Sequence, residues 1–282
     1  MNSLEPIGSR VKMKKHRMLF SILIFTFLSF QIYSQTDNPK TGDQEELEII
    51  LKKCAEYCER LDNVSLHFIC KEKITEEILK GRLAFVERYI YIYDYQLIRK
   101  ANKIVEQRIL IKENGRKKNV LDAQLKTKRF HHKYIVFGPI GLLSREQQKN
   151  YEYKILKDVT YKREKAVILE ALPKSLNGIN ALYGKIWIRK KDFAILKIEW
   201  NQESLENFEE IEKIAEELEA KPRITFISEY GFEKNKIRFP NKYSVEESYI
   251  PRFEVEKKLI WSQTTVNYDN YKFFTVDTKV KY

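Results

Sequence analysis

Three cysteines and one nearby histidine are the side chains whose spacing first suggests chemistry. Cys54 and Cys58 lie four residues apart in a stretch with helical periodicity, and Cys70 follows in the next expected strand. A loop of modest length would let Cys58 pair with Cys70 in an oxidising compartment, with Cys54 to Cys70 as the alternative. His67 would complete a set of metal ligands, but the chain has no paired C-x-x-C knuckle. The spacing therefore favours a Cys58–Cys70 disulfide over a metal site.

The motifs of common catalytic sites are missing from the sequence. It has no G-x-S-x-G, no H-E-x-x-H, no Walker loop and no G-x-G-x-x-G. Carboxylates are too numerous for one pair to be chosen as acid and base without geometry. We therefore predict a protein that is not an enzyme and that has no cofactor and no metal. An envelope hydrolase with scattered carboxylates is a weaker alternative.

Residues 1–34 have the layout of a signal peptide. Basic residues at 14–17 precede an uncharged apolar run over 18–32, which is short for a spanning helix of about 20 apolar residues. Cleavage is expected after Ser34, although a membrane anchor is the alternative. Residues 35–42 then form a polar linker and residues 43–282 a single domain. This layout predicts export to the periplasm or cell envelope, with membrane association that is transient at most.

The net charge of +12 can favour nucleic acid, anionic lipid or acidic glycans as partners. Lys and Arg are interspersed with Glu and Asp along the expected strands, and no compact basic patch accompanies the tyrosines. The charge therefore indicates a solvated outer sheet face, and no nucleic-acid partner is expected.

Alternating apolar residues predict an antiparallel sheet, most clearly in a hairpin over residues 184–200. Side chains at every second position of a strand share a face, so this hairpin is half-buried. Its inward side is expected to hold Ile186, Ile188, Leu196, Ile198 and Trp200, and its outward side Lys185, Trp187, Arg189 and Lys197.

Two other stretches of alternation complete the expected inner face. Leu66 and Phe68 alternate with polar residues in the strand that begins at Asn63. Residues 88–100 place tyrosines on one face of a strand and isoleucines, among them Ile90 and Ile92, on the other. A strand that is apolar on both faces is expected where it lines a cavity or where the sheet is covered on both sides. Asn114-Gly115 predicts a tight hairpin turn, and residues 116–133 a basic, exposed excursion.

Apolar residues three and four apart predict two amphipathic helices. The first covers residues 43–61, with Asp43 as its N-cap. The second covers residues 204–220 and has a strongly acidic polar side, so it is either a surface helix or a lid over the sheet. Strands are expected afterwards at 224–232, 242–250, 254–262 and 264–280.

This order of elements resembles the outer-membrane lipoprotein-sorting (LolA-like) proteins. Three stretches carry the resemblance: GKIWIRKKDFAILKIEW, RFPNKYSVEESYI and TTVNYDNYKFFTVDTKV. The resemblance implies a mainly β (α+β) fold, in which a curved antiparallel sheet forms an unclosed barrel around or under two amphipathic helices. It also implies an apolar cavity that takes acyl chains, covered by the helices at 43–61 and 204–220.

We therefore predict a binder of a lipid or lipoprotein acyl chain, because burying apolar area contributes about 25 cal/mol per Å². The alternative is a cell-envelope interaction or sensor module, whose core is filled by its own side chains and which binds a protein partner. The residues expected to line the ligand cavity are Leu66, Phe68, Ile90, Ile92, Ile186, Ile188, Leu196, Ile198 and Trp200.

Overall fold

The computed structural model describes residues 40–63, 67–80, 85–100, 103–126, 135–175, 182–205, 208–253 and 258–274. All of them belong to one compact unit, Pro39–Tyr282. The expected signal peptide over residues 1–34 lies outside the described residues. Within the described ranges, none of the helices combines the length and the apolar character needed to cross a membrane.

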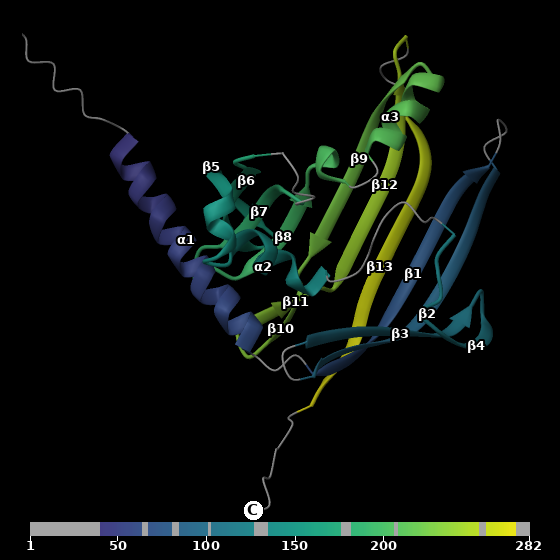
Figure 1. Cartoon of the computed structure of the whole chain (residues 1–282), viewed down its shortest axis with the longest axis horizontal. Coiled ribbons are helices and arrows are strands. Elements are labelled where there is room, and N and C mark those ends of the chain that lie inside the picture. The colour runs from purple at the N-terminus through teal and green to yellow at the C-terminus, as the bar shows by residue number, and fades with distance from the viewer. Residues whose placement is uncertain are drawn as a thin grey trace, which may run out of the picture. The chain divides into compact units, whose positions relative to one another are not determined.

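The unit is built on an antiparallel sheet of eleven strands (Figure 1). Their order is β4-β3-β2-β1-β13-β12-β9-β8-β7-β6-β5, and in the described part of the chain the end strands β4 and β5 do not pair with each other. The sheet is therefore open, as predicted. Its strands are β1 (Phe68–Lys80), β2 (Phe85–Lys100), β3 (Lys103–Glu113), β4 (Arg116–Leu121), β5 (Tyr151–Tyr161), β6 (Glu164–Pro173), β7 (Gly184–Arg189), β8 (Ile195–Trp200), β9 (Ala220–Glu229), β12 (Lys242–Pro251) and β13 (Leu259–Phe273), and β10 (Phe232–Lys234) pairs separately with β11 (Ile237–Phe239).

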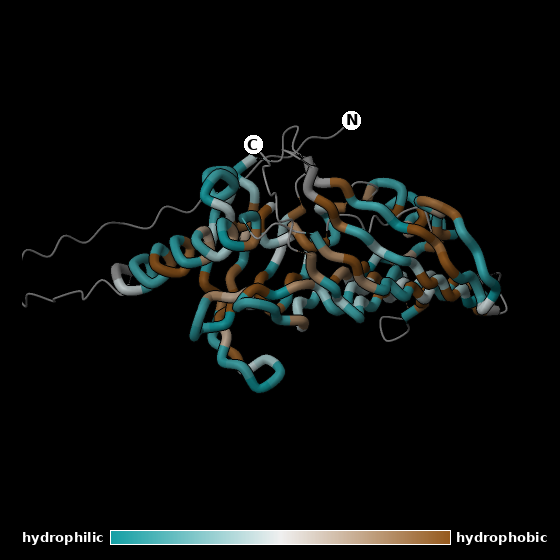
Figure 2. Tube along the Cα trace, turned by 90° about the horizontal axis from the view of Figure 1, so that it is seen from below, coloured by the Kyte–Doolittle hydropathy of each residue, from teal (hydrophilic) through white to brown (hydrophobic). Residues whose placement is uncertain are grey.

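The alternation of side chains decides which face of the sheet is the inner one. Figure 2 shows hydrophobic and hydrophilic positions alternating along the strands. In β2, Tyr91, Tyr93 and Tyr95 are buried, whereas the alternate residues Ile90 and Ile92 are half-exposed. Successive side chains of a strand point to opposite faces, so the tyrosines belong to the inner face and these two isoleucines to the outer face.

Helices pack on the part of the unit that contains β5 to β9. α1 (Lys40–Asn63) contacts α2 (Gly138–Leu143), β5 and β11, and Figure 1 shows it beside the β5–β8 end of the sheet. α3 (Phe208–Glu217) packs mainly on β9, with Ile211 and Ala215 buried, as expected for a surface helix. Single helical turns are η1 (Ile135–Phe137), η2 (Gln147–Asn150) and η3 (Gln202–Ser204). The buried residues of α1 are Ile50, Cys54, Ala55, Tyr57, Cys58 and Leu61.

The predicted hairpin over residues 184–200 is confirmed as β7 and β8. Ile186 pairs with Ile198 across the two strands, and both side chains are buried. Arg189, however, was expected to face solvent and is only 2% exposed. Its charge is compensated there, since the guanidinium donates to the carboxylates of Glu164, Asp192 and Glu233.

The C-terminal strands differ from the prediction of separate strands at 254–262 and 264–280, whose residues 254–257 and 275–280 lie outside the described ranges. One strand, β13, runs through the expected break, because buried residues continue at every second position from Ser262 to Tyr268. It pairs with β1 on one side and β12 on the other. The Asn114-Gly115 turn between β3 and β4 forms as predicted, with φ of 46° and 80° at its two residues.

Candidate functional site

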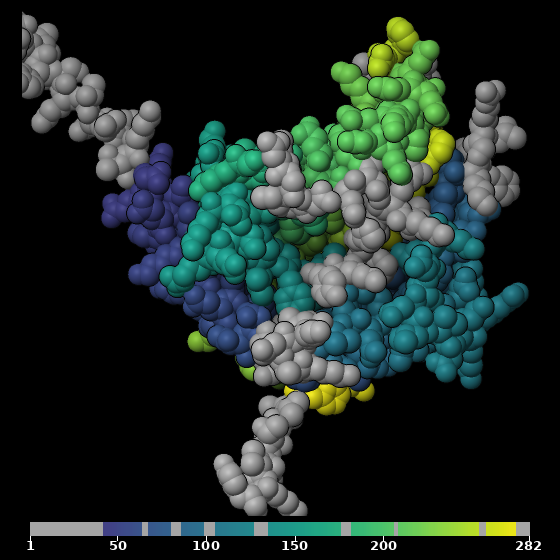
Figure 3. Space-filling model, in the orientation of Figure 1, coloured from purple at the N-terminus to yellow at the C-terminus, as the bar shows by residue number. Residues whose placement is uncertain are grey.

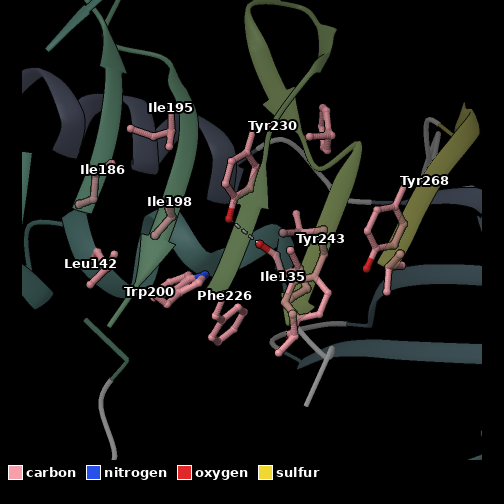
Figure 4. Close-up of a cluster of buried hydrophobic side chains, with 14 of the residues drawn as sticks. Ile135, Leu142, Ile186, Ile195, Ile198, Trp200, Phe226, Tyr230, Tyr243 and Tyr268 are labelled. Carbon is pink, nitrogen blue, oxygen red and sulfur yellow. Dashed lines mark hydrogen bonds between the residues drawn. The ribbon is translucent and has the colours of Figure 1, made fainter. Parts of the chain in front are cut away.

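The inner face of the sheet has an apolar half, which we define by Ile186, Ile198, Trp200, Phe226 and Tyr243. These side chains come from β7, β8, β9 and β12, and Figure 4 shows them gathered with Leu142 of α2. The Trp200 and Phe226 ring centroids lie 5.7 Å apart, and the Phe226 and Tyr243 rings meet edge to face at 5.2 Å. The polar atoms of the aromatic residues are paired locally, as Trp200 Nε1 donates to Ser228 Oγ at 3.0 Å.

α2 and the turn before it lie directly against this apolar half. The Tyr230 hydroxyl donates to the Ile135 carbonyl oxygen at 2.9 Å (Figure 4). A Cβ at Gly138 would come within 2.6 Å of that hydroxyl and 3.1 Å of the Trp200 ring. Glycine at position 138 therefore allows α2 to approach the aromatic side chains closely.

α1 covers the other side of α2, and it carries two of the three cysteines. Cys58 Sγ donates to the Pro139 carbonyl oxygen at 3.4 Å, whereas Cys70 lies on β1 beside Tyr271. Burial raises the pKa of the Cys58 thiol to about 12. Cys54, Cys58 and Cys70 are all buried free thiols, so the structure does not show the predicted Cys58–Cys70 disulfide.

The inner face also has a polar half on β1, β2 and β3, which we define by Glu72, Glu76, Tyr93, Tyr95 and Arg108. Arg108 Nε donates to Glu72 Oε2 at 2.8 Å, and its guanidinium lies 4.7 Å from the centre of the Tyr95 ring. Glu76 accepts from the backbone N–H of Lys126 at 3.0 Å. Burial raises the pKa of the Glu72 carboxyl, although the positive charge of Arg108 acts in the opposite direction.

Polar groups extend across the neighbouring strands β12 and β13 as well. Glu247 is buried and accepts from the Tyr249 hydroxyl at 2.7 Å and from Ser262 Oγ at 2.8 Å. The inner face is thus divided between an apolar and a polar half, with Val245 and Val266 buried between them. The expectation of a continuous apolar inner face was wrong, because carboxylates occupy inner positions of β1 and β12.

The structure buries six of the nine predicted lining residues but brings together only the four on β7 and β8 that face the apolar half, since Phe68 packs on β1 against the rings of Phe239 and Tyr271. Ile90 and Ile92 were misassigned, since they lie on the outer face of β2 and the tyrosines take the inner positions. Leu66 lies outside the described residues. The buried members of the predicted set are Phe68, Ile186, Ile188, Leu196, Ile198 and Trp200.

Leu196 is buried at a different place from the rest of the set. It lies at a bulge, where the β7–β8 register shifts between Trp187 and Ile188. Its side chain lines a separate cleft of about 210 Å³ together with Tyr161 and Glu229. Leu196 is therefore not part of the apolar half.

Sequence reasoning missed the polar half, although a signal for it was present. Glu72 and Glu76 have the same parity in β1 as Phe68 and Ile74, so alternation alone places them inward. Their charge argues for the opposite face, because a buried carboxylate is costly unless it is paired. Arg108, which pairs with Glu72, is 36 residues away in the sequence and gives no local sign of that role.

The comparisons with known proteins concern the fold. No family model and no curated protein sequence matches the chain. Similar solved structures include a domain described as an outer membrane lipoprotein-sorting protein from Vibrio parahaemolyticus, with 11% identity, a TM-score of 0.44 and coverage of 83% of this chain and 94% of that chain.

Two further similar structures come from other bacteria. A LolA superfamily protein from Nitrosomonas europaea has 13% identity and a TM-score of 0.37, and covers 82% of this chain and 96% of that one. A DUF1329 family protein from Desulfovibrio piger has 13% identity and a TM-score of 0.38, with coverage of 82% and 95%. Structures of the fold family that the sequence resembles are therefore among those similar to this chain.

Proposed function

We propose that this chain is a non-enzymatic protein that binds an amphiphile, such as a lipid or the acyl chain of a lipoprotein, on the inner face of its open sheet. The observation that supports this most directly is the division of that face. An acyl chain suits the apolar half around Trp200 and Phe226, where each buried CH₂ group contributes about 0.8 kcal/mol. The polar part of the same molecule suits the neighbouring carboxylates, tyrosines and Arg108.

A wholly apolar ligand would fit this face less well. Arg108 and the Lys126 N–H already donate to Glu72 and Glu76, but Glu72 Oε1 accepts no hydrogen bond among the described residues. Hydrocarbon over this buried oxygen would supply no donor, and burial of a polar atom without a partner is costly. A ligand with one apolar and one polar end avoids that cost.

The proposed place of action is the periplasm or cell envelope. The proposal follows from the basic and then apolar order of residues 14–32. Mass spectrometry of the protein recovered from its own envelope should give a mature chain that begins at Gln35. A mature protein that retains residues 1–34 would contradict cleavage.

Native mass spectrometry of that material, followed by organic extraction, tests the binding proposal. We expect a co-purifying amphiphile, and we expect a fluorescent fatty acid to bind the emptied protein at micromolar concentration. Absence of both would contradict the proposal and would favour an interaction module with a self-filled core.

A pair of variants separates the two faces of the sheet. Phe226→Leu removes the ring beside Trp200 but keeps an apolar side chain, and it should weaken fatty-acid binding about fivefold. Ile92→Ala is the matched control on the outer face and should leave binding unchanged. Equal effects of the two substitutions would contradict binding at the apolar half, provided that circular dichroism shows both variants folded.

A further inference from the structure

β4 is an exposed edge strand. It lies at one end of the sheet order in the described part of the chain, and all six of its side chains, from Arg116 to Leu121, are exposed. Figure 3 shows the β3–β4 region at the periphery of the visible face. On an antiparallel edge strand, alternate residues direct their backbone N–H and C=O groups away from the sheet. We call this set of groups and side chains the β4 edge.

The β4 edge is fixed in position at both ends. At its start, Asn114 exchanges two hydrogen bonds of 2.8 Å with the backbone of Ile90 on β2. At its end, the Asp122 N–H donates to the Arg108 carbonyl oxygen at 2.7 Å, and Asp122 Oδ1 accepts from the Arg108 N–H at 3.3 Å. A partner strand would therefore meet an edge that is already ordered, which lowers the entropic cost of association.

The charge of the β4 edge selects the kind of partner. Lys118 is ion-paired with Glu113 at 3.3 Å, but among the described residues Arg116 and Lys117 make no ion pair. A second copy of β4 would bring another three basic residues to the same strand pair, and like charges on neighbouring strands are unfavourable. Carboxylates opposite the same residues are favourable.

The far end of the strand adds an apolar contact. Val120 and Leu121 are 45% and 58% exposed. They would give one or two apolar side chains of a partner a place to pack. The edge thus combines backbone donors and acceptors, a basic start and an apolar end.

We propose that the β4 edge binds an acidic, extended segment of a partner protein by strand addition. Backbone hydrogen bonds extend the sheet by one strand, and carboxylates lie near Arg116 or Lys117. Apolar side chains of the partner pack on Val120 on one face of the sheet and on Leu121 on the other. This interaction is separate from the amphiphile site, because β4 lies at the periphery and its side chains are exposed.

A labelled peptide tests strand addition. The probe is a fluorescein-labelled peptide of about eight alternating glutamate and valine residues, the length of an ordinary strand. Its matched controls are two forms of the same peptide, one methylated on the backbone nitrogens of the odd positions and one on those of the even positions. Methylation keeps the charge of the peptide but removes backbone hydrogen-bond donors. We expect the unmethylated peptide to bind in fluorescence anisotropy and to slow amide exchange in β4, and at least one methylated form to lose binding.

Variants of the full chain test the role of charge. Lys117→Glu should weaken binding of the peptide about tenfold. Lys185→Glu makes the same change of charge on the exposed side of β7 and should have less than about a threefold effect. The proposal would be overturned if both methylated peptides bound as tightly as the unmethylated one, or if the two substitutions weakened binding equally. Binding to anionic lipid vesicles but not to the peptide would also overturn it.

Discussion

The guanidinium of Arg108 crosses the ring of Tyr95 to reach the carboxylate of Glu72. Its Cζ lies 4.7 Å from the ring centre, and its Nε lies 2.8 Å from Glu72 Oε2. The three residues come from β3, β2 and β1, so one buried side chain connects three strands. In the polar half, the groups that join these strands are therefore the same groups that the proposed ligand would meet.

Arg108→Met should destabilise the protein strongly. The substitution keeps most of the side-chain volume but leaves the buried Glu72 carboxylate without its ion pair, and we expect the free energy of unfolding to fall by about 3–5 kcal/mol. Arg145→Met is the control, because Arg145 pairs with Glu59 on the surface, and it should cost less than about 1 kcal/mol. Urea unfolding measures both, and similar losses would contradict the buried pair.

The contribution of Glu72 to stability should depend on pH. Burial raises the pKa of its carboxyl in the folded protein, so the folded state binds the proton more tightly than the unfolded chain. This stability is fully present below the unfolded-state pKa of about 4.3 and is lost as the pH rises through the folded value. Relative to Glu72→Gln, the wild type should therefore gain stability as the pH falls toward the unfolded-state pKa. A difference that stays constant, or that changes in the opposite direction, would contradict the raised pKa.

All three cysteines should be present as protected thiols. Burial raises the pKa of Cys58 to about 12 and also raises the pKa of Cys54, so little thiolate forms at pH 8. Iodoacetamide should modify the folded protein slowly, and it should add three groups in denaturant without a reductant. A single modification in denaturant would instead reveal a disulfide.

Gly138→Ala should loosen the contact between α2 and the apolar half. The added methyl group would meet the Tyr230 hydroxyl and the Trp200 ring, and such overpacking costs about 1–3 kcal/mol. Gly141→Ala, in the same helix, meets no atom within 4 Å and should be neutral or stabilising. Thermal unfolding compares the two, and equal melting temperatures would contradict the close approach at Gly138.

Features set by local sequence could be predicted. The spacing of Ile50, Cys54 and Leu61 gives α1, Asn114-Gly115 gives the β3–β4 turn, and alternation around Ile186 gives the β7–β8 hairpin. In each case the signal lies within a few neighbouring residues. Backbone geometry and burial of one face are enough to determine these elements.

Features that depend on distant partners could not be predicted. Hydrophobicity favours Ile92 over Tyr93 as an inner residue, but the Tyr93 hydroxyl finds a partner in the Ala123 carbonyl oxygen at 3.0 Å. The same holds for Tyr95, whose hydroxyl donates to Glu106 at 2.6 Å. Burial of polar residues becomes favourable only when tertiary structure supplies these partners, and alternation does not reveal them.

Quenching of Trp200 fluorescence tests the central claim, that the apolar half binds an acyl chain. Bromine on a fatty acid quenches a tryptophan that it touches, and unbrominated stearate serves as the control. Trp187 is half-exposed on the outer side of the sheet, beneath Lys197. We therefore predict that dibromostearate quenches the fluorescence of the wild type and of the Trp187→Phe variant. It should not quench Trp200→Phe, even though native mass spectrometry shows the ligand bound. Quenching that persists without Trp200, or no quenching of the wild type at saturation, would contradict the account.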